Sequence, residues 1–185
     1  EDKTMSMESL IKKLQNIMRG DDLSGTVQYL KQMIWMIFLK IYDAQEEKWE
    51  LLEDDYTSII PEELKWRNWA VDNNDGKALT GDELIKFVND NLMMGLKRLE
   101  VNEYTPKRHL IVWQMFQDAS NFMKNGTKLR QMINELNEKD FTNSTETHEF
   151  GDMYESMLKD LQESKRDGGE FYTPRALTDF IVEKV

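Results

Sequence analysis

The chain has 185 residues, and its 24 lysines and arginines stand against 35 aspartates and glutamates, which gives a net charge of −11. A chain with this negative charge is poorly suited to binding nucleic acid phosphates by itself, because such binding depends on clustered Lys and Arg. The absence of cysteine excludes disulfides and thiolate metal sites, and the longest apolar run, Met33 to Leu39, is far shorter than the roughly 20 residues of a membrane span. We therefore expect a cytoplasmic protein with no membrane and no metal partner.

Apolar residues recur at helical spacing along almost the whole chain. The first stripe ends at Gly20, as a helix often does, and consists of Leu10, Ile11, Leu14, Ile17 and Met18. Ser24 or Gly25 opens a second helix, which is apolar on nearly every side through its middle and is therefore expected at the centre of the core. Beyond Tyr42 the sequence becomes polar, and we expect this end of the helix to reach solvent.

Further helical segments follow, and most of them begin at a threonine or a proline. The predicted starts are Pro61, Thr80, Pro106 and Thr127, and a last full helix holds the apolar residues from Phe150 to Leu161. Glu83 follows Thr80 at the spacing of a capping box. Loops are expected near residues 53–60, 70–80, 100–105, 120–126 and 140–147. Because no stretch alternates at strand spacing, we predict an all-α fold, a compact multi-helix domain.

The helical pattern breaks at residues 164–169, Ser-Lys-Arg-Asp-Gly-Gly, where the backbone is freest. Thr173 is a good N-cap and Pro174 suits the first helical position, so a new helix is expected to start there. We predict a helical N-terminal domain over 1–164, and a linker with the start of a second domain over 165–185. Only about three turns of that last helix are included, so the chain is expected to be a fragment.

An acidic turn at residues 72–76, Asp-Asn-Asn-Asp-Gly, allows a calcium-binding interpretation. Placing Gly76 sixth in an EF-hand loop puts Val71 first and Asp82 twelfth. A valine side chain cannot ligate a cation, and Asp is shorter than the usual bidentate Glu. An Asn/Asp/Gly turn before a helix is the better interpretation, with a calcium-binding regulator as the weaker alternative.

Other catalytic chemistry has no motif in this chain. His109 and His148 are the only histidines, and they are too far apart in sequence to form a two-histidine zinc motif on one helix. The chain contains no Gly-x-Ser-x-Gly elbow and no glycine-rich phosphate loop. We therefore assign no catalytic residue and no metal ligand.

The most specific motif follows the linker, where residues 168–175 read Gly-Gly-Glu-Phe-Tyr-Thr-Pro-Arg. This stretch resembles the modification (M) subunit of type I restriction–modification DNA adenine-N6 methyltransferases. In that family a helix and a Lys/Gly-rich loop precede Gly-Glu-Phe-Tyr-Thr-Pro-Arg. The corresponding helix here includes Met153 to Leu161, and Met18-Arg19-Gly20 resembles the family's Leu-Arg-Gly. The resemblance covers essentially the whole chain.

The resemblance implies that residues 165–185 begin an α/β, S-adenosylmethionine-dependent methyltransferase domain that is truncated here. In the family the Phe-Tyr-Thr-Pro segment helps to hold the methionine part of the cofactor, and a free helix N-terminus suits its carboxylate. Cofactor contact is therefore carried over to Tyr172, Thr173 and Pro174, and then to Phe171 and Glu170. The family's glycine-rich loop and Asn/Asp-Pro-Pro-aromatic motif do not occur in this chain, which alone is expected to be inactive.

The resemblance also implies partners, namely the specificity subunit, the restriction subunit and DNA, with which the helical domain assembles the catalytic domain. A candidate DNA-facing patch is Lys97-Arg98 with Lys107-Arg108, for which solvated surface charge is the simpler interpretation. The alternative from another class is a stand-alone helical protein-interaction module unrelated to methylation. The tryptophans and methionines would then form a groove for partner helices, although such residues more often build a core.

Overall fold

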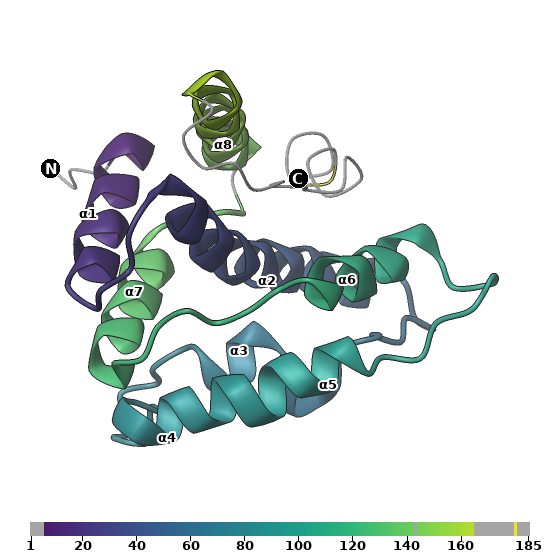
Figure 1. Ribbon diagram of the computed structural model, residues 1–185. Coiled ribbons are helices and arrows are strands. Elements are labelled where there is room, and N and C mark those ends of the chain that lie inside the picture. Colours follow the sequence, from purple (N-terminus) through teal and green to yellow (C-terminus); the bar gives the residue numbers. More distant parts are fainter. Residues whose placement is uncertain (1–5, 143, 165–179, 181–185) are drawn as a thin grey trace, which may run out of the picture.

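Helices joined by loops make up the computed structural model, which describes residues 6–142, 144–164 and 180 (Figure 1). No strand occurs within these residues, so the all-α prediction for the N-terminal domain is confirmed. None of the helices in this part of the chain is long and apolar enough to cross a bilayer. The α-helices are α1 (Met7–Arg19), α2 (Thr26–Leu52), α3 (Trp66–Trp69), α4 (Gly81–Lys86), α5 (Met94–Lys97), α6 (Lys107–Gln117), α7 (Gly126–Glu138) and α8 (Ser144–Ser164).

Helix α1 begins and ends where its sequence predicts. The Ser6 hydroxyl accepts a hydrogen bond from the backbone N–H of Ser9 at 3.2 Å, which satisfies one of the free donors of the first turn. Gly20 follows the last residue, and its N–H donates to the carbonyls of Asn16 and Met18. The apolar stripe of α1 is buried, and the helix packs against α7, α8 and α2.

Helix α2 lies across the middle of the molecule, with α8 on one side and the α4–α5 rod on the other (Figure 1). Its central residues Trp35, Phe38 and Tyr42 are fully buried, as the all-round apolar pattern predicts. α2 packs against α1, α3 and α8. This central position lets one helix contact segments from both ends of the chain.

The prediction that α2 reaches solvent beyond Tyr42 is wrong for its next turn. Asp43 is buried and pairs with the guanidinium of Arg67 on α3 at 2.8 Å, and Glu46 is 0% exposed. The chain folds back after α2, and its following segments cover these carboxylates. The helix reaches solvent from Glu47 and Lys48 onward, as predicted, and Leu51 and Leu52 in the last turn are 85% and 81% exposed.

The rod below α2 in Figure 1 is one continuous run of helix whose middle is π-helical. α4 passes into a π-helix, η2 (Phe87–Met93), and then into α5, while a 3₁₀ turn, η1 (Glu62–Leu64), precedes α3. The predicted capping box is wrong. Thr80 does occupy the N-cap position, but its side chain makes no cap hydrogen bond, because Gly81 at φ 60° turns the first helical residue away from standard geometry.

The remaining helices follow the predicted order with shifted starts. α6 begins directly after Pro106, as predicted. α7 begins at Gly126, one residue before Thr127, because the side chain of Asn125 caps it by accepting from Lys128 N–H at 3.1 Å. The loop prediction at 140–147 is wrong for its last four residues, which belong to α8 from Ser144 onward.

Candidate functional site

The five residues predicted to contact the cofactor, Glu170, Phe171, Tyr172, Thr173 and Pro174, lie outside the described residues. The structure does describe Phe180, in the same C-terminal stretch. Its side chain is only 6% exposed and contacts two rings of α2. The ring centroid of Phe180 lies 5.7 Å from that of Phe38 and 5.7 Å from that of Tyr42. Phe180 is therefore packed on the central helix.

Phe180 contacts one end of an aromatic row, which we define as Phe38, Tyr42, Trp49 and Tyr56. Residues four and seven apart fall on one face of a helix, so the first three rings of the row share a face of α2. Successive ring centroids are 5.6, 5.6 and 5.7 Å apart, within the range of favourable aromatic contacts. The row therefore connects the Phe180 contact to the C-terminal end of α2.

Arg108 closes the other end of the aromatic row. Its guanidinium lies 4.7 Å from the ring centroid of Trp49 and 5.0 Å from that of Tyr56, within cation–π range. The same guanidinium donates two hydrogen bonds to Glu53, at 2.6 and 3.0 Å. These bonds hold the pKa of the Glu53 carboxyl below its usual value and raise the pKa of Arg108. Both groups are therefore ionised and mutually neutralised.

This arrangement corrects the candidate DNA-facing patch. The sequence groups Arg108 with Lys97, Arg98 and Lys107 in that patch, but the charge and the donors of Arg108 are directed to Glu53 and to the aromatic rings. A guanidinium already bound to a carboxylate on both arms has little left to offer a phosphate. Arg108 is therefore removed from the candidate patch, which leaves Lys97, Arg98 and Lys107.

Two phenol groups tie the row to its surroundings. The Tyr42 hydroxyl donates to the backbone carbonyl of Arg108 at 2.8 Å, and the Tyr56 hydroxyl donates to the buried carboxylate of Glu46. Burial is the main cause that raises the pKa of both tyrosines, so they remain neutral donors at physiological pH. The start of α6 and the segment after α2 are in this way fixed to α2.

A surface hollow of about 690 Å³ adjoins Arg108, between the segment after α2 and the start of α6. Tyr56, Arg108 and His109 line it, together with the carboxylates of Glu53, Asp54, Asp55 and Glu100. Burial, followed by the nearby Arg108, lowers the pKa of His109, so this imidazole is uncharged at neutral pH. The hollow is acidic overall, which suits neither DNA nor another anion.

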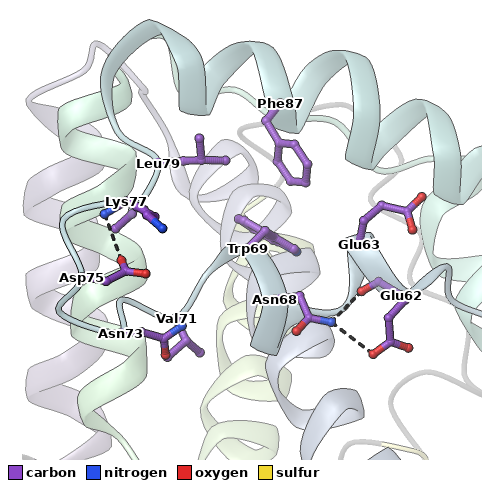
Figure 2. A pocket seen from close by; sticks show the side chains of 11 residues that line it. Glu62, Glu63, Asn68, Trp69, Val71, Asn73, Asp75, Lys77, Leu79 and Phe87 are labelled. Carbon is purple, nitrogen blue, oxygen red and sulfur yellow. Dashed lines mark hydrogen bonds between the residues drawn. The ribbon is translucent and has the colours of Figure 1, made fainter.

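Figure 2 shows a second hollow, of about 680 Å³, between α3, η2 and the loop that follows α3. Trp69 and Phe87 line it and pack against each other, with ring centroids 5.5 Å apart. The loop includes the acidic turn for which calcium binding is the weaker alternative. Asp72 accepts from Asn74 N–H at 2.8 Å, and Asp75 accepts from Lys77 N–H at 2.9 Å. These are the Asx turns that the turn interpretation predicts.

Neither hollow brings together a catalytic set. Within residues 6–142, 144–164 and 180, no group of three or more His, Asp or Glu side chains is arranged to hold a metal ion. The two histidines lie on different helices, with His109 half-buried on α6 and His148 exposed on α8. The arrangement that stands out is structural: aromatic rings and ion pairs that join remote segments to α2.

Sequence reasoning missed the pairing of Arg108 with Glu53 and the burial of Glu46. The two partners of the ion pair are 55 positions apart, so no local pattern links them. The sequence did hold a signal for part of the aromatic row, because the seven-residue spacing of Tyr42 and Trp49 places both rings on one face of the helix.

Comparisons with known proteins match two adjoining families. Residues 7–136 match the family described as "HsdM N-terminal domain", and residues 145–185 match "N-6 DNA Methylase". The chain is 52% identical over 182 residues to the methylase subunit of the type I restriction enzyme EcoEI of Escherichia coli, covering 98% of this chain and 36% of that protein. It is 26% identical to the StySPI methylase subunit of Salmonella potsdam, covering 83% of this chain and 25% of that protein.

Solved structures give the same picture. A modification subunit of a putative type I restriction enzyme from Vibrio vulnificus YJ016 superposes with a TM-score of 0.72 at 31% identity, covering 100% of this chain and 42% of that one. A chain from a structure on complex assembly and conformational transition of the type I R-M system gives a TM-score of 0.71 at 32% identity, covering 93% and 34%. The chain thus spans 25% to 42% of the length of these relatives.

Proposed function

This chain belongs to the HsdM N-terminal domain family of type I restriction–modification methylase subunits, and we propose that it serves as the assembly domain of a site-specific DNA adenine-N6 methyltransferase. The observation that carries the proposal is the order of the two family matches, a helical N-terminal domain over 7–136 and an N-6 DNA methylase segment over 145–185. The contact of Phe180 with α2 supports it, because it joins the two matched segments physically. A stand-alone interaction module gives no reason for the second match.

The division into 1–164 and 165–185 is part of the proposal. The Lys-Arg-Asp-Gly-Gly run that follows Ser164 supports a boundary there, because its two glycines leave the backbone free. The methylase match begins earlier, at residue 145, and so includes α8. Helix α8 packs against α1 and α2, and its Phe150 and Tyr154 are buried; on this ground we assign it to the helical domain.

We assign the cofactor role to S-adenosylmethionine, which an adenine-N6 methyltransferase uses as methyl donor. Tyr172, Thr173 and Pro174, with Phe171 and Glu170, are the residues proposed to contact it. Methyl transfer by these 185 residues alone is not expected, because a glycine-rich loop and an Asn/Asp-Pro-Pro-aromatic motif are not among them. The chemistry is assigned to the longer protein.

The proposed partners are the specificity subunit, the restriction subunit and DNA. The net negative charge of the chain lies in its helical part, and the guanidinium of Arg108 in that part is bound to Glu53. Both features favour contacts of this domain with protein subunits over direct contacts with phosphates. One of the two structural neighbours comes from work on complex assembly in the type I R-M system, which supports an assembly role.

The experiment uses the full-length gene product, purified with and without its specificity subunit. Titration calorimetry with S-adenosylmethionine should detect binding, and Tyr172→Ala should weaken it. Methylation of adenine in duplex DNA should require the specificity subunit. Absence of any binding by the wild-type subunit would contradict the proposed function, whereas unchanged binding by Tyr172→Ala would remove only that residue from the site.

A further inference from the structure

We propose that the surface around the C-terminal end of α2 is a docking site for a protein segment that presents apolar side chains flanked by lysines or arginines. The α2-end surface, as we define it, consists of three exposed apolar side chains and three carboxylates: Leu51, Leu52, Tyr104, Asp54, Asp55 and Glu100. All six residues belong to the helical domain. The inference goes beyond the proposed function, because it gives the place and the chemistry of one protein contact and does not depend on methyl transfer.

The apolar part of the α2-end surface consists of side chains that the fold leaves almost fully in solvent. Leu51, Leu52 and Tyr104 are 85%, 81% and 84% exposed. Among the residues that the structure describes, the other exposed large apolar side chains are Val71 and Met94, at only 38% and 40%. Single exposed apolar residues are common on protein surfaces, whereas a group of them at one place indicates a binding surface.

The two leucines and Tyr104 come from segments that lie side by side. The hollow of about 690 Å³ is lined both by Glu53, the residue after Leu52, and by Thr105, the residue after Tyr104. The hydrogen bonds between Arg108 and Glu53 join the same two segments. In Figure 1 the loop before α6 projects from the end of the molecule at which α2 ends. The exposed apolar side chains therefore adjoin one hollow from two segments.

Both segments hold their exposed side chains in place. The leucines lie in the last turn of α2, which Arg108 fixes through its bonds to Glu53. In the loop, the Asn102 side chain accepts from Tyr104 N–H at 2.8 Å, and the Thr105 hydroxyl accepts from Asn102 N–H at 2.9 Å. An ordered surface loses less conformational freedom when a partner binds, and tyrosine is a frequent anchor of protein interfaces.

The hollow beside these side chains is negatively charged. Four carboxylates and one guanidinium line it. Glu53 is neutralised by Arg108, but within the described part of the chain no lysine or arginine pairs with Asp54, Asp55 or Glu100. The last turn of α2 contains no basic residue, so the negative end of the helix dipole adds to these charges.

This charge determines which partner fits the α2-end surface. Lysines or arginines on either side of an apolar segment complement the carboxylates while the apolar side chains cover the leucines and Tyr104. Lys97, Arg98 and Lys107 of the candidate DNA-facing patch are not among the residues that line the hollow. DNA, an anionic membrane surface and a second copy of the same acidic surface are all repelled by it.

The test selects peptides from a phage-displayed library of short random sequences, with the full-length gene product as target. Counter-selection against the double variant Leu51→Ser, Leu52→Ser keeps only the peptides that need the leucines. We expect the enriched peptides to combine apolar residues with Lys or Arg. The inference is overturned if no peptide is enriched, or if the enriched peptides carry no positive charge.

Calorimetry then measures the dissociation constant of one enriched peptide for purified variants. The leucine double variant should bind it about tenfold more weakly, because the central anchors of an interface carry most of the binding energy. Asp54→Asn with Asp55→Asn should bind it more weakly and with a smaller dependence on salt. Val71→Ser, at the second hollow, is the matched control and should bind like wild type. Equal losses in Val71→Ser and in the leucine variant would overturn the inference.

The remaining outcomes concern folding, a second copy and the proposed function. Because both leucines are exposed, the double variant should melt near the wild-type temperature. Should it not fold, Tyr104→Ser, which leaves α2 unchanged, replaces it in both experiments with the same expected and contradicting results. Self-association of the wild type in sedimentation experiments, abolished by the leucine variant, would assign the surface to a second copy and overturn the inference. Failure of the wild type to bind S-adenosylmethionine would contradict only the proposed function.

Discussion

Arg108 at the start of α6 holds Glu53 at the end of α2 through two hydrogen bonds of 2.6 and 3.0 Å, across 55 positions of sequence. The guanidinium also covers the rings of Trp49 and Tyr56. One side chain thereby joins the last turn of the central helix to the first turn of a remote one. The same contacts place Arg108 at one end of the aromatic row, and Phe180 contacts the other end.

The first prediction concerns the ion pair of Arg108 with Glu53. Arg108→Lys keeps the positive charge, but an ammonium can neither form the two parallel bonds to Glu53 nor lie flat on the two rings. We expect the melting temperature to fall by a few degrees, and part of the loss to vanish at high salt, where the exposed component of the ion pair is already screened. Lys107→Met, at the exposed neighbouring position, serves as the control and should melt near the wild-type temperature. If Arg108→Lys melted at the wild-type temperature, the bidentate ion pair and the ring contacts of Arg108 would contribute nothing to stability.

The second prediction concerns the close approach of α4 and α7. A Cβ added at Gly126 would lie 1.8 Å from the carbonyl oxygen of Gly81, which is backbone and cannot move aside cheaply. We expect Gly126→Ala to destabilise the fold by about 1–3 kcal/mol or more, measured by urea denaturation. Gly20→Ala is the control, since its Cβ would meet the flexible end of Lys128 at 3.1 Å. Equal stability of the two variants would contradict this packing.

The third prediction concerns Arg130 of α7, whose guanidinium ties down the loops on either side of the acidic turn. It donates to the carbonyls of Leu79 and Ala70, both at 2.7 Å. Arg130→Met keeps much of the apolar stem but leaves the Leu79 carbonyl without this donor, at a cost of about 1–3 kcal/mol. Ala70 keeps a second donor in Asn137, at 3.1 Å.

Unfolding curves of Arg130→Met and Arg130→Lys check this account. The lysine variant can restore one of the two bonds, so it should fall between wild type and Arg130→Met in free energy of unfolding. Indistinguishable stabilities for all three proteins would mean that these two bonds do not hold the loops.

The fourth prediction concerns Lys40, whose pKa burial lowers from 10.5 to about 8, against the opposing charge of Asp140. Between these two pH values the unfolded chain keeps the Lys40 proton and the folded protein has released it. Because the unfolded state then binds more protons, the free energy of unfolding rises with pH in this window. The contribution is at most about 3 kcal/mol.

The measurement compares wild type with Lys40→Met by urea denaturation between pH 7.5 and 10.5. The free energy of unfolding of wild type minus that of Lys40→Met should increase as pH rises. The titration of other groups, such as Tyr42 and Tyr56, occurs in both proteins and cancels in that difference. Lys86→Met, an exposed lysine on α4, supplies the matched control. A pH-independent difference for Lys40→Met would contradict the prediction.

The helices and their order could be predicted because their determinants are local. The stripe that ends at Gly20 and the proline before α6 lie within the segments they define, so one sequence is enough to read them. The errors are also local in origin. The capping box predicted at Thr80 does not form because Gly81 takes a positive φ, which a glycine allows but which the sequence alone does not predict.

For the candidate site too, local features could be predicted from the sequence and long-range contacts could not. The sequence alone led to the methylase family through the Gly-Glu-Phe-Tyr-Thr-Pro-Arg stretch, because a signature is a property of consecutive residues. Only the tertiary structure decided that Phe180 packs on Phe38 and Tyr42, that Glu46 is buried, and that Arg108 is neutralised by Glu53. Periodicity reports which face of a helix is apolar. Which remote segment covers that face depends on the packing of the whole chain, and in this protein that packing brings Phe180, a few residues beyond the family signature, onto the central helix.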